Sequence, residues 1–309
     1  MQVALVGRTE VLVEAGNALL ERGHRISLVA TRKEEGYYRA TQEDFRHLAA
    51  RAGAAFLGDA DLGLAGASQL LRDLGCEVAL SVHWPTRVST GVLAIPRHGF
   101  LNLHFSDLPR YRGNAGPSWS ILTGDAHQGI TLHRMVAELD AGPVLSSARM
   151  PLDPDTSVSD LFDWWRAIAP RMLVDAVDAL ARGSATFSPQ SADPGAIVRS
   201  YPLRVTDAHI DWKQPVEAVH RLVRAFTRPF PGAFTSLEGQ RRVTVWRSAR
   251  TGPGSFLAVP GQVLVASAGE PVIACADGGL ELVELELEGC ADPAEAKRAI
   301  LRSRRHRLI

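Results

Sequence analysis

The sequence is poor in cysteine and contains no long apolar run. Its three cysteines are odd in number, widely spaced and free of any CxxC or Cys/His pattern that would hold a metal ion tetrahedrally (Cys76, Cys275 and Cys290). No stretch approaches the roughly 18 consecutive apolar residues that a membrane span requires. We therefore expect a protein of a reducing compartment, with no metal cofactor and no membrane partner.

Three further absences narrow the class of protein. The start, MQVALVGRTEVLVEAG, has neither the charged segment nor the small-residue cleavage site of a signal peptide, which predicts a cytoplasmic location. Lys plus Arg and Asp plus Glu are both 34, so the net charge of +0 generates no long-range attraction for polyanions such as nucleic acid. The first apolar run ends Val-Gly-Arg-Thr-Glu, without the GxGxxG glycines of dinucleotide-binding folds, so an NAD-dependent enzyme is not expected.

Length and periodicity predict an α/β protein with two domains. A chain of 309 residues exceeds the roughly 100–200 residues typical of one domain, and 46% hydrophobic residues suffice for a core in each. In the first part, short apolar runs alternate with segments of helical spacing, which is typical of a mostly parallel sheet with helices on both faces. The predicted strands cover residues 2–7, 25–31, 77–82, 100–105, 129–135 and 143–150, and the predicted helices include residues 42–52, 67–74 and 157–181.

A change of composition after residue 183 predicts a domain boundary. Residues 182–203 are rich in Gly, Ser, Pro and Ala and have no sustained period, as in a linker. A helix that ends before Pro229 and short strands separated by Gly- or Pro-containing turns then predict a small antiparallel barrel or sheet. Those strands cover residues 242–247, 261–267, 271–276 and 280–288, and a helix at 293–302 follows. We expect domains at 1–183 and 204–309, joined by a linker at 184–203.

The densest group of unusual residues lies between Phe100 and Asn114, in the string FLNLHFSDLPRYRGN. Asn102 and His104 are two residues apart, so on a strand they point to the same face. That strand end is the edge at which open parallel sheets bind their ligands. Because preorganised donors stabilise the negative charge that develops on a carbonyl oxygen under attack, the pair indicates acyl transfer.

Asp140 supplies a carboxylate to the same prediction. It lies in Glu138-Leu-Asp-Ala-Gly-Pro143, after the predicted strand at 129–135, and Gly142 would shape its loop. An amine that attacks a carbonyl must lose a proton, and Asp140 is a candidate to accept it directly or through one water. The structural alternatives are an aspartate that caps a turn and a histidine that packs in a strand. Taken singly, these residues leave both interpretations open.

The combined motifs identify a family resemblance. The string from Asn102 to Gly113, NLHFSDLPRYRG, followed by Leu139-Asp-Ala-Gly142, closely resembles the signature of the 10-formyltetrahydrofolate-dependent formyltransferases. That family includes enzymes that act on methionyl-tRNA, sugar nucleotides and glycinamide ribonucleotide. Gly129–Met135 (GITLHRM), Ile210–Trp212 (IDW) and Arg228–Phe234 (RPFPGAF) are similar to the branches that append a small barrel-like domain. The resemblance therefore covers most of the chain.

The resemblance implies a Rossmann-like catalytic domain, a small barrel-like (OB-type) C-terminal domain and 10-formyltetrahydrofolate as co-substrate. It places the catalytic triad on Asn102, His104 and Asp140. The implied cofactor-binding residues are His83, Trp84, Pro85, Arg87, Val88, Leu139 and Gly142. The expected acceptor-binding residues are Ser106, Arg112, Gly113, Asn114 and Trp119. Asp107 departs from the family, which usually has an apolar residue there, and His133 is interpreted as structural.

Charge limits the identity of the acceptor. Residues 204–309 contain 15 Lys plus Arg and 12 Asp plus Glu, a difference of only +3, whereas phosphate contacts to tRNA need clustered basic residues. We therefore predict a small-molecule amine, either an amino-sugar nucleotide or an amino-acid-derived amine such as hydroxyornithine. A methionyl-tRNA formyltransferase, a formyltetrahydrofolate hydrolase and a non-catalytic folate-binding module stay open as alternatives. The sequence also leaves a homodimer open.

Overall fold

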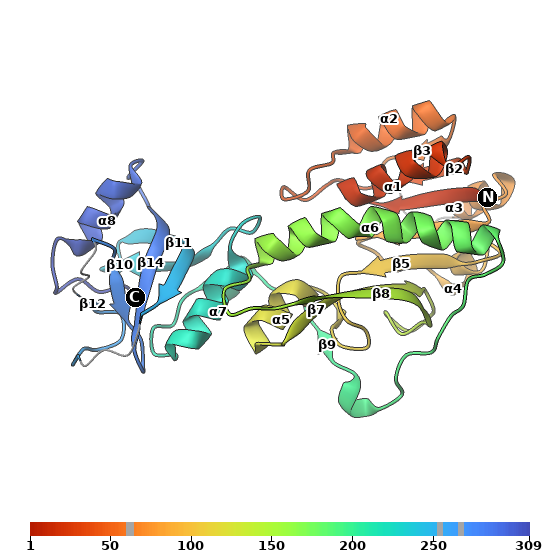
Figure 1. Cartoon of the computed structure of the whole chain (residues 1–309). Helices are drawn as coiled ribbons and strands as arrows, with labels where there is room; N and C mark the ends of the chain where they lie inside the picture. Colours follow the sequence, from red (N-terminus) through yellow and green to blue (C-terminus); the bar gives the residue numbers. More distant parts are fainter. Residues whose placement is uncertain (60–64, 252–255, 265–268) are drawn as a thin grey trace. The chain divides into compact units, whose positions relative to one another are not determined.

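The computed structural model describes residues 1–59, 65–251, 256–264 and 269–309, which form two compact units (Figure 1). Residues 265–267 of one predicted strand lie outside these ranges. The first unit consists of Met1–Gly116, Gln128–Met150 and Phe162–Tyr201. The second consists of Pro117–His127, Pro151–Leu161 and Pro202–Ile309. The chain thus alternates between the units, each of which is built from three separate segments.

A seven-stranded sheet forms the centre of the first unit, in the order β3-β2-β1-β4-β5-β7-β8. Strands β1 to β5 pair in parallel, whereas β7 runs antiparallel to β5. The carboxyl ends of β1, β4 and β5 therefore meet at one edge of the sheet. The strands are β1 (Gln2–Gly7), β2 (Arg25–Ala30), β3 (Ala55–Leu57), β4 (Val78–Val82), β5 (Phe100–His104), β7 (His127–Arg134) and β8 (Val144–Pro151).

Burial on both faces explains why β1 is a continuous apolar run. Ala4 belongs to a cluster on one face that includes Leu71 of α3. Leu5 faces the other side, where Gly16 of α1 lies between Leu5 and Leu48 of α2. Parallel strands covered on both faces need apolar residues at every position, which is the pattern that the sequence has here.

The helices of this unit follow the strands in the expected alternation. They are α1 (Glu10–Glu21), α2 (Gln42–Ala52), α3 (Ala65–Asp73), α4 (Thr90–Leu93) and most of α6 (Val158–Ala181). At the start of α2, the Thr41 amide donates to Asp44, and Gly53 ends the helix with a positive φ of 63°. None of the helices in the described part of the chain is long and apolar enough to cross a membrane.

Residues 184–201, most of the segment predicted as a linker, pack with the first unit. Ser188 and Val144 exchange two backbone hydrogen bonds of 2.7 and 2.8 Å. Further along, β9 (Arg199–Ser200) pairs in parallel with β6 (Arg112–Gly113). The segment also contains a short 3-10 helix at Pro194–Ala196. It therefore has defined contacts along its length, although its sequence has no apolar period.

The second unit contains a five-stranded antiparallel sheet, in the order β10-β11-β14-β13-β12. The C-terminal residues bridge both of its edges, since Leu308 pairs with Leu237 of β10 and Arg307 pairs with Gln262 beside β12. This curled sheet and the mostly parallel sheet of the first unit confirm the predicted fold class. The elements are α5 (Gly116–Thr123), the 3-10 helix Val205–Ala208, α7 (Val216–Phe226), β10 (Ala233–Leu237), β11 (Arg241–Arg250), β12 (Val263–Leu264), β13 (Val272–Ala274), β14 (Gly279–Leu287) and α8 (Pro293–Leu301).

Candidate active site

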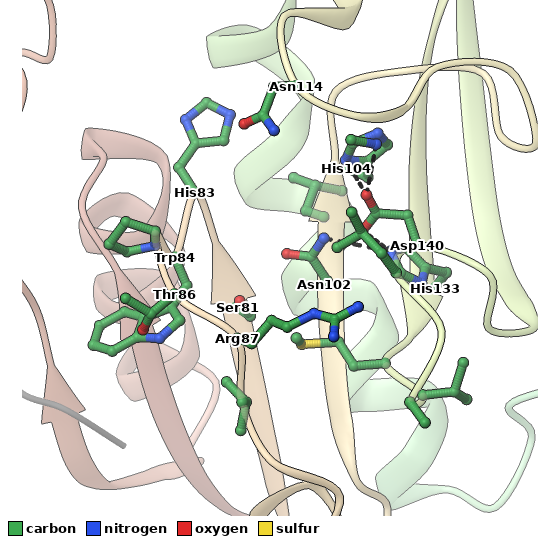
Figure 2. Close-up of a pocket in the computed structure, with 18 of the residues that line it drawn as sticks. Ser81, His83, Trp84, Thr86, Arg87, Asn102, His104, Asn114, His133 and Asp140 are labelled. Carbon is green, nitrogen blue, oxygen red and sulfur yellow. Dashed lines mark hydrogen bonds and ion pairs between the residues drawn. The ribbon is translucent and has the colours of Figure 1, made fainter. Parts of the chain in front are cut away.

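A cavity of about 600 Å³ opens in the first unit at the carboxyl ends of β4 and β5. This volume is in the usual range of small-molecule sites, roughly 300–1,000 Å³. One wall is formed by the segment after β4, and another by the loop that contains Asp140 (Figure 2). Asn102 and His104 of β5 lie between these walls and share one face of the strand, as their spacing predicts.

Asn102 has its side-chain amide oriented by His133. The two residues are register partners across β5 and β7, and Asn102 Nδ2 lies 3.3 Å from His133 Nε2. His133 Nδ1 donates to the Arg134 carbonyl at 3.1 Å, so in the neutral ring Nε2 is the acceptor. Asn102 therefore donates one N–H to His133 and keeps its second N–H for the cavity.

A backbone carbonyl also defines the tautomer of His104. Its Nε2 is 2.8 Å from the Tyr111 carbonyl oxygen, which can only accept, so Nε2 carries the hydrogen. The lone pair of the neutral ring is then on Nδ1. That atom lies 3.8 Å from Asp140 Oδ2 (Figure 2).

Asp140 lies on a strained loop, where a backbone amide donates to its carboxylate and two histidine rings lie beside it. Its backbone φ is 52°, in the left-handed region that residues other than glycine rarely adopt. The Gly113 amide donates to Oδ2 at 2.9 Å, and His133 Nε2 is 3.6 Å from Oδ1. The carboxylate thus faces His104 with one oxygen and His133 with the other.

The environment sets opposite charge states for His104 and Asp140. Burial lowers the pKa of His104 below its ordinary value, although the Asp140 carboxylate and the bond to Tyr111 partly oppose this. Burial raises the pKa of Asp140, but His104, His133 and the Gly113 amide together bring it below its ordinary value. At neutral pH the pair therefore consists of a neutral imidazole and a carboxylate.

The wall after β4 combines a packed histidine with unpaired polar atoms. The His83 ring stacks on the Trp165 ring, with 5.1 Å between ring centroids. Its Nδ1 is hydrogen-bonded to the Tyr38 hydroxyl at 3.0 Å. Burial lowers the pKa of His83 to about 4, so this ring is neutral. Ser81 Oγ and Trp84 Nε1 are buried in the lining and have no hydrogen-bond partner among the described residues. Hydrogen bonds within the described part of the chain therefore leave these two atoms unsatisfied.

The other residues selected from the sequence fall into two groups. Eight of them line the cavity: His83, Trp84, Pro85, Arg87, Val88, Leu139, Gly113 and Asn114. Ser106 and Arg112 do not line it, because the Ser106 hydroxyl donates to the Arg110 and Tyr111 carbonyls and Arg112 binds Gln190 and Glu138. Gly142 shapes the loop rather than the cavity surface, since an added Cβ would lie 1.7 Å from the Arg134 carbonyl oxygen.

Trp119 and Asp107 complete the comparison with the sequence. Trp119 lies on α5, in the second unit. Asp107, the departure from the family pattern, forms an ion pair with Arg149 at 3.0 Å. This pairing accounts for a charged residue at a position where an apolar one is usual.

Two lining residues were missed or misinterpreted from the sequence. His133 was interpreted as structural, yet it lies in the cavity wall between Asn102 and Asp140. Ser81 was not selected, although it is the register partner of Asn102 on β4. Both residues are register partners of Asn102 on the two neighbouring strands, and this pairing across strands is not visible in the local sequence pattern.

Comparison with known proteins gives two family matches. The profile described as "Formyl transferase" matches residues 1–177, and "Formyl transferase, C-terminal domain" matches residues 202–297. A methionyl-tRNA formyltransferase of Pseudomonas paraeruginosa is 32% identical over 292 residues, which cover 94% of this chain and 92% of the relative.

Solved structures with the same fold include proteins crystallised with folates. An N-formyltransferase from Helicobacter canadensis, solved with folinic acid and dTDP-3-aminofucose, has a TM-score of 0.67 at 15% identity and covers 91% of this chain and 98% of its own. HypX from Aquifex aeolicus in complex with tetrahydrofolic acid has a TM-score of 0.62 at 17% identity and covers 96% of this chain and 46% of its own. At these identities the likeness concerns the fold.

Proposed function

This chain belongs to the formyl transferase family and is an enzyme that transfers a formyl group, and on that premise we propose that it moves the group from 10-formyltetrahydrofolate to the amine of a small molecule. The observation that carries the proposal is the juxtaposition of Asn102, His104 and Asp140 in one cavity. An amide donor, a neutral imidazole and a carboxylate are the groups that acyl transfer to an amine requires.

Two unsatisfied polar atoms beside the cavity support the proposal of a folate there. Ser81 Oγ and Trp84 Nε1 are buried without a partner among the described residues, and unsatisfied buried polar groups of this kind are costly unless a ligand or water binds them. A pterin ring presents both donors and acceptors. The bound folate would supply a formyl group on a nitrogen that can leave. His83, Trp84 and Arg87 would hold it from the β4 side, and Leu139 from the loop side.

Asn102 is the donor to the formyl oxygen in this proposal. Attack by the amine places negative charge on that oxygen, and the second N–H of Asn102 is the amide hydrogen not already donated to His133. His133 fixes which side of the amide faces the cavity. It is therefore a positioning residue for Asn102.

His104 moves the proton. Its Nδ1 lone pair faces Asp140 rather than a backbone donor, so it can accept the proton that the attacking amine loses. The same proton then goes from Nδ1 to the nitrogen that leaves, as the bond between that nitrogen and the formyl carbon breaks. No proton is gained or lost overall. This modifies the expectation from sequence, in which His104 was a donor from the start.

Asp140 stabilises the positively charged imidazole between those two transfers. Oδ2 is 3.8 Å from Nδ1, a distance at which a carboxylate favours the charged form of histidine. It can also receive the amine proton through one water, the role predicted from sequence. In either case its negative charge is required.

Charge pairing supports a small acceptor. In the first unit, Arg39 pairs with Asp163 at 3.4 Å. In the second unit, Arg221 pairs with Glu217 at 2.9 Å and Arg228 with Glu284 at 2.6 Å. Basic residues that are neutralised by neighbouring carboxylates attract phosphates weakly. An amino-sugar nucleotide or an amino-acid-derived amine fits this surface better than a tRNA does.

Methionyl-tRNA is the second candidate acceptor. The observation in its favour is the 32% identity with a methionyl-tRNA formyltransferase across 94% of this chain. The two candidates differ in salt dependence, because binding of a polyanion weakens steeply as salt rises whereas binding of a small amine does not.

The acceptor prediction is tested with purified protein and 10-formyltetrahydrofolate. We expect an amino-sugar nucleotide or a hydroxyornithine-type amine to gain the mass of one formyl group in place of one hydrogen, measured by mass spectrometry. Charged initiator tRNA serves as the competing acceptor, assayed at low and high salt. Formylation of the tRNA alone would replace the small-amine proposal, and rapid formate release without any amine would indicate a hydrolase. Folate binding without turnover would indicate a non-catalytic module.

A second prediction concerns Gly142. In Gly142→Ala the new Cβ would collide with the Arg134 carbonyl oxygen, so the loop must move and take Asp140 with it. We expect kcat to fall at least about tenfold, measured in steady-state assays on folded protein. Gly36→Ala is the matched control, since a Cβ at Gly36 meets nothing within 4 Å. Equal activity of the two variants would contradict the loop geometry.

A further inference from the structure

The side chain of Gln190 binds the backbone of the loop that contains Asp140. The Gln190 Nε2 amide donates to the Asp140 carbonyl at 2.7 Å and to the Gly142 carbonyl at 2.9 Å. One NH₂ group thus bridges two backbone acceptors on either side of Ala141. These bonds act on the loop backbone, whereas the carboxylate of Asp140 points to His104 and His133.

The orientation of the Gln190 amide is fixed by Arg112. Gln190 Oε1 accepts from Arg112 Nε at 3.1 Å and from Nη2 at 2.8 Å, which leaves only the NH₂ group to face the loop. Arg112 is 6% exposed and also contacts Glu138 at the start of the loop at 3.3 Å. We call Gln190 and Arg112 together the clamp. Through the buried Arg112 guanidinium, the clamp joins Glu138, in the first part of the loop, to Gly142, in its last part.

Arg112 also connects the clamp to both catalytic partners. The residue before it, Tyr111, accepts from His104, and the residue after it, Gly113, donates to Asp140. The consecutive residues 111, 112 and 113 thus contact His104, Gln190 and Asp140, respectively. A shift of this segment or of the loop would change the distance between Nδ1 and the carboxylate.

The loop requires such support because its backbone is strained. Asp140 has a φ of 52°, and residues other than glycine remain in this region only where neighbouring contacts hold them there. Gln190 in turn lies on a segment that is anchored by Ser188 pairing with Val144 and by Arg199 pairing with β6. This anchored segment contacts the loop through Gln190, which does not line the cavity.

We propose that Gln190 is a positioning residue, which holds the Asp140 carboxylate at the distance from His104 that proton transfer requires. The proposal rests on the proposed role of Asp140 in catalysis. Loss of the clamp would let the loop relax, and an orientation error of this kind lowers the rate of the chemical step more than it lowers binding.

The test compares Gln190→Met with wild type in steady-state assays. We expect kcat to fall about tenfold while KM for either substrate changes less than about twofold. Gln190→Glu keeps the acceptor for Arg112 but offers no N–H to the two carbonyls, so it should be impaired at least as much. Gln128→Met is the matched control, because Gln128 Nε2 also donates to two carbonyls, those of Phe105 and Gly129, each at 2.9 Å. That variant should lose thermal stability but keep kcat within about twofold.

A double-mutant cycle separates positioning from general stability. In the Asp140→Asn background, Gln190→Met should cause less than about a twofold further loss, because the group that it positions is already removed. A further tenfold loss in that background would overturn the proposal. The acid limb of kcat/KM should shift to lower pH in Gln190→Met, since a more distant carboxylate raises the pKa of His104 less. An unchanged limb would also count against it.

Hydrogen exchange distinguishes failure of this inference from failure of the proposed function. Amides of residues 138–142 should exchange faster in Gln190→Met than in wild type, whatever the reaction of the enzyme. Protection that is unchanged would show that Gln190 does not hold the loop. Full activity of Asp140→Asn would instead refute the catalytic role on which the inference depends.

Discussion

Replacing Asp140 with asparagine is expected to lower kcat by about 10²-fold or more, with the shape of the side chain retained. The substitution removes the charge that stabilises the imidazolium form of His104, 3.8 Å away. It also leaves the Gly113 amide opposite a neutral group. Steady-state kinetics with saturating folate and amine measure the effect, and KM should change little because the binding surfaces are kept.

The pH profile of the same variant has a definite sign. His104 must be neutral to accept a proton, so kcat/KM is retained above the pKa of His104 and lost as pH falls through it. Asp140 raises that pKa, so Asp140→Asn should move the acid limb to lower pH. A limb that moves to higher pH would contradict the assigned roles. Asp178→Asn is the control, because Asp178 forms a similar pair with His24 at 2.8 Å and should leave kcat within about twofold of wild type.

Replacing His104 with alanine is expected to cause an equal or larger loss, about 10²- to 10³-fold in kcat. The variant lacks the group that takes the proton from the amine and returns it to the leaving nitrogen. The loss of kcat/KM at low pH should disappear from its pH profile. Added imidazole should restore part of the rate. Both are measured in the assay used for Asp140→Asn.

Controls for His104→Ala must separate lost chemistry from lost folding. His24→Ala removes another buried histidine that pairs with a carboxylate, and it should keep kcat within about twofold. Folate affinity of His104→Ala, measured by calorimetry, should stay within about threefold of wild type. Normal turnover in His104→Ala would refute the site assignment, and lost folate binding would show that His104 acts in binding instead.

The centre of the first unit could be predicted closely from sequence because β1 and β4 are buried along almost their whole length. The apolar run at residues 2–7 has the same bounds as β1, and α2 also begins and ends where the pattern places it. Strand β10 was missed. Its buried positions include Thr235, whose hydroxyl accepts from Trp212 Nε1, so the apolar alternation is interrupted by a satisfied polar residue.

The site shows the limit of reasoning from one sequence. Asn102 and His104 are neighbours on one strand, so their shared face follows from spacing alone. The roles of His133 and Gln190 depend on contacts across 31 and 50 residues of chain. Residues 184–203 have the sequence pattern of a linker because their contacts include backbone hydrogen bonds and the side chains of Gln190 and Arg199 rather than a periodic apolar face. Hydrophobic periodicity cannot report contacts of that kind.

The alternation of the chain between its two units has a consequence for recombination with relatives. The second unit includes Pro117–His127 and Pro151–Leu161 as well as the C-terminal segment. Ser118 donates to the Ala225 carbonyl at 2.9 Å, and Arg224 donates to the Thr156 carbonyl at 2.7 Å, so these inserts are bonded to α7. A chimera joined at residue 202 would separate α7 from the two segments to which it is hydrogen-bonded. A functional exchange of this unit has to transfer three pieces of sequence together.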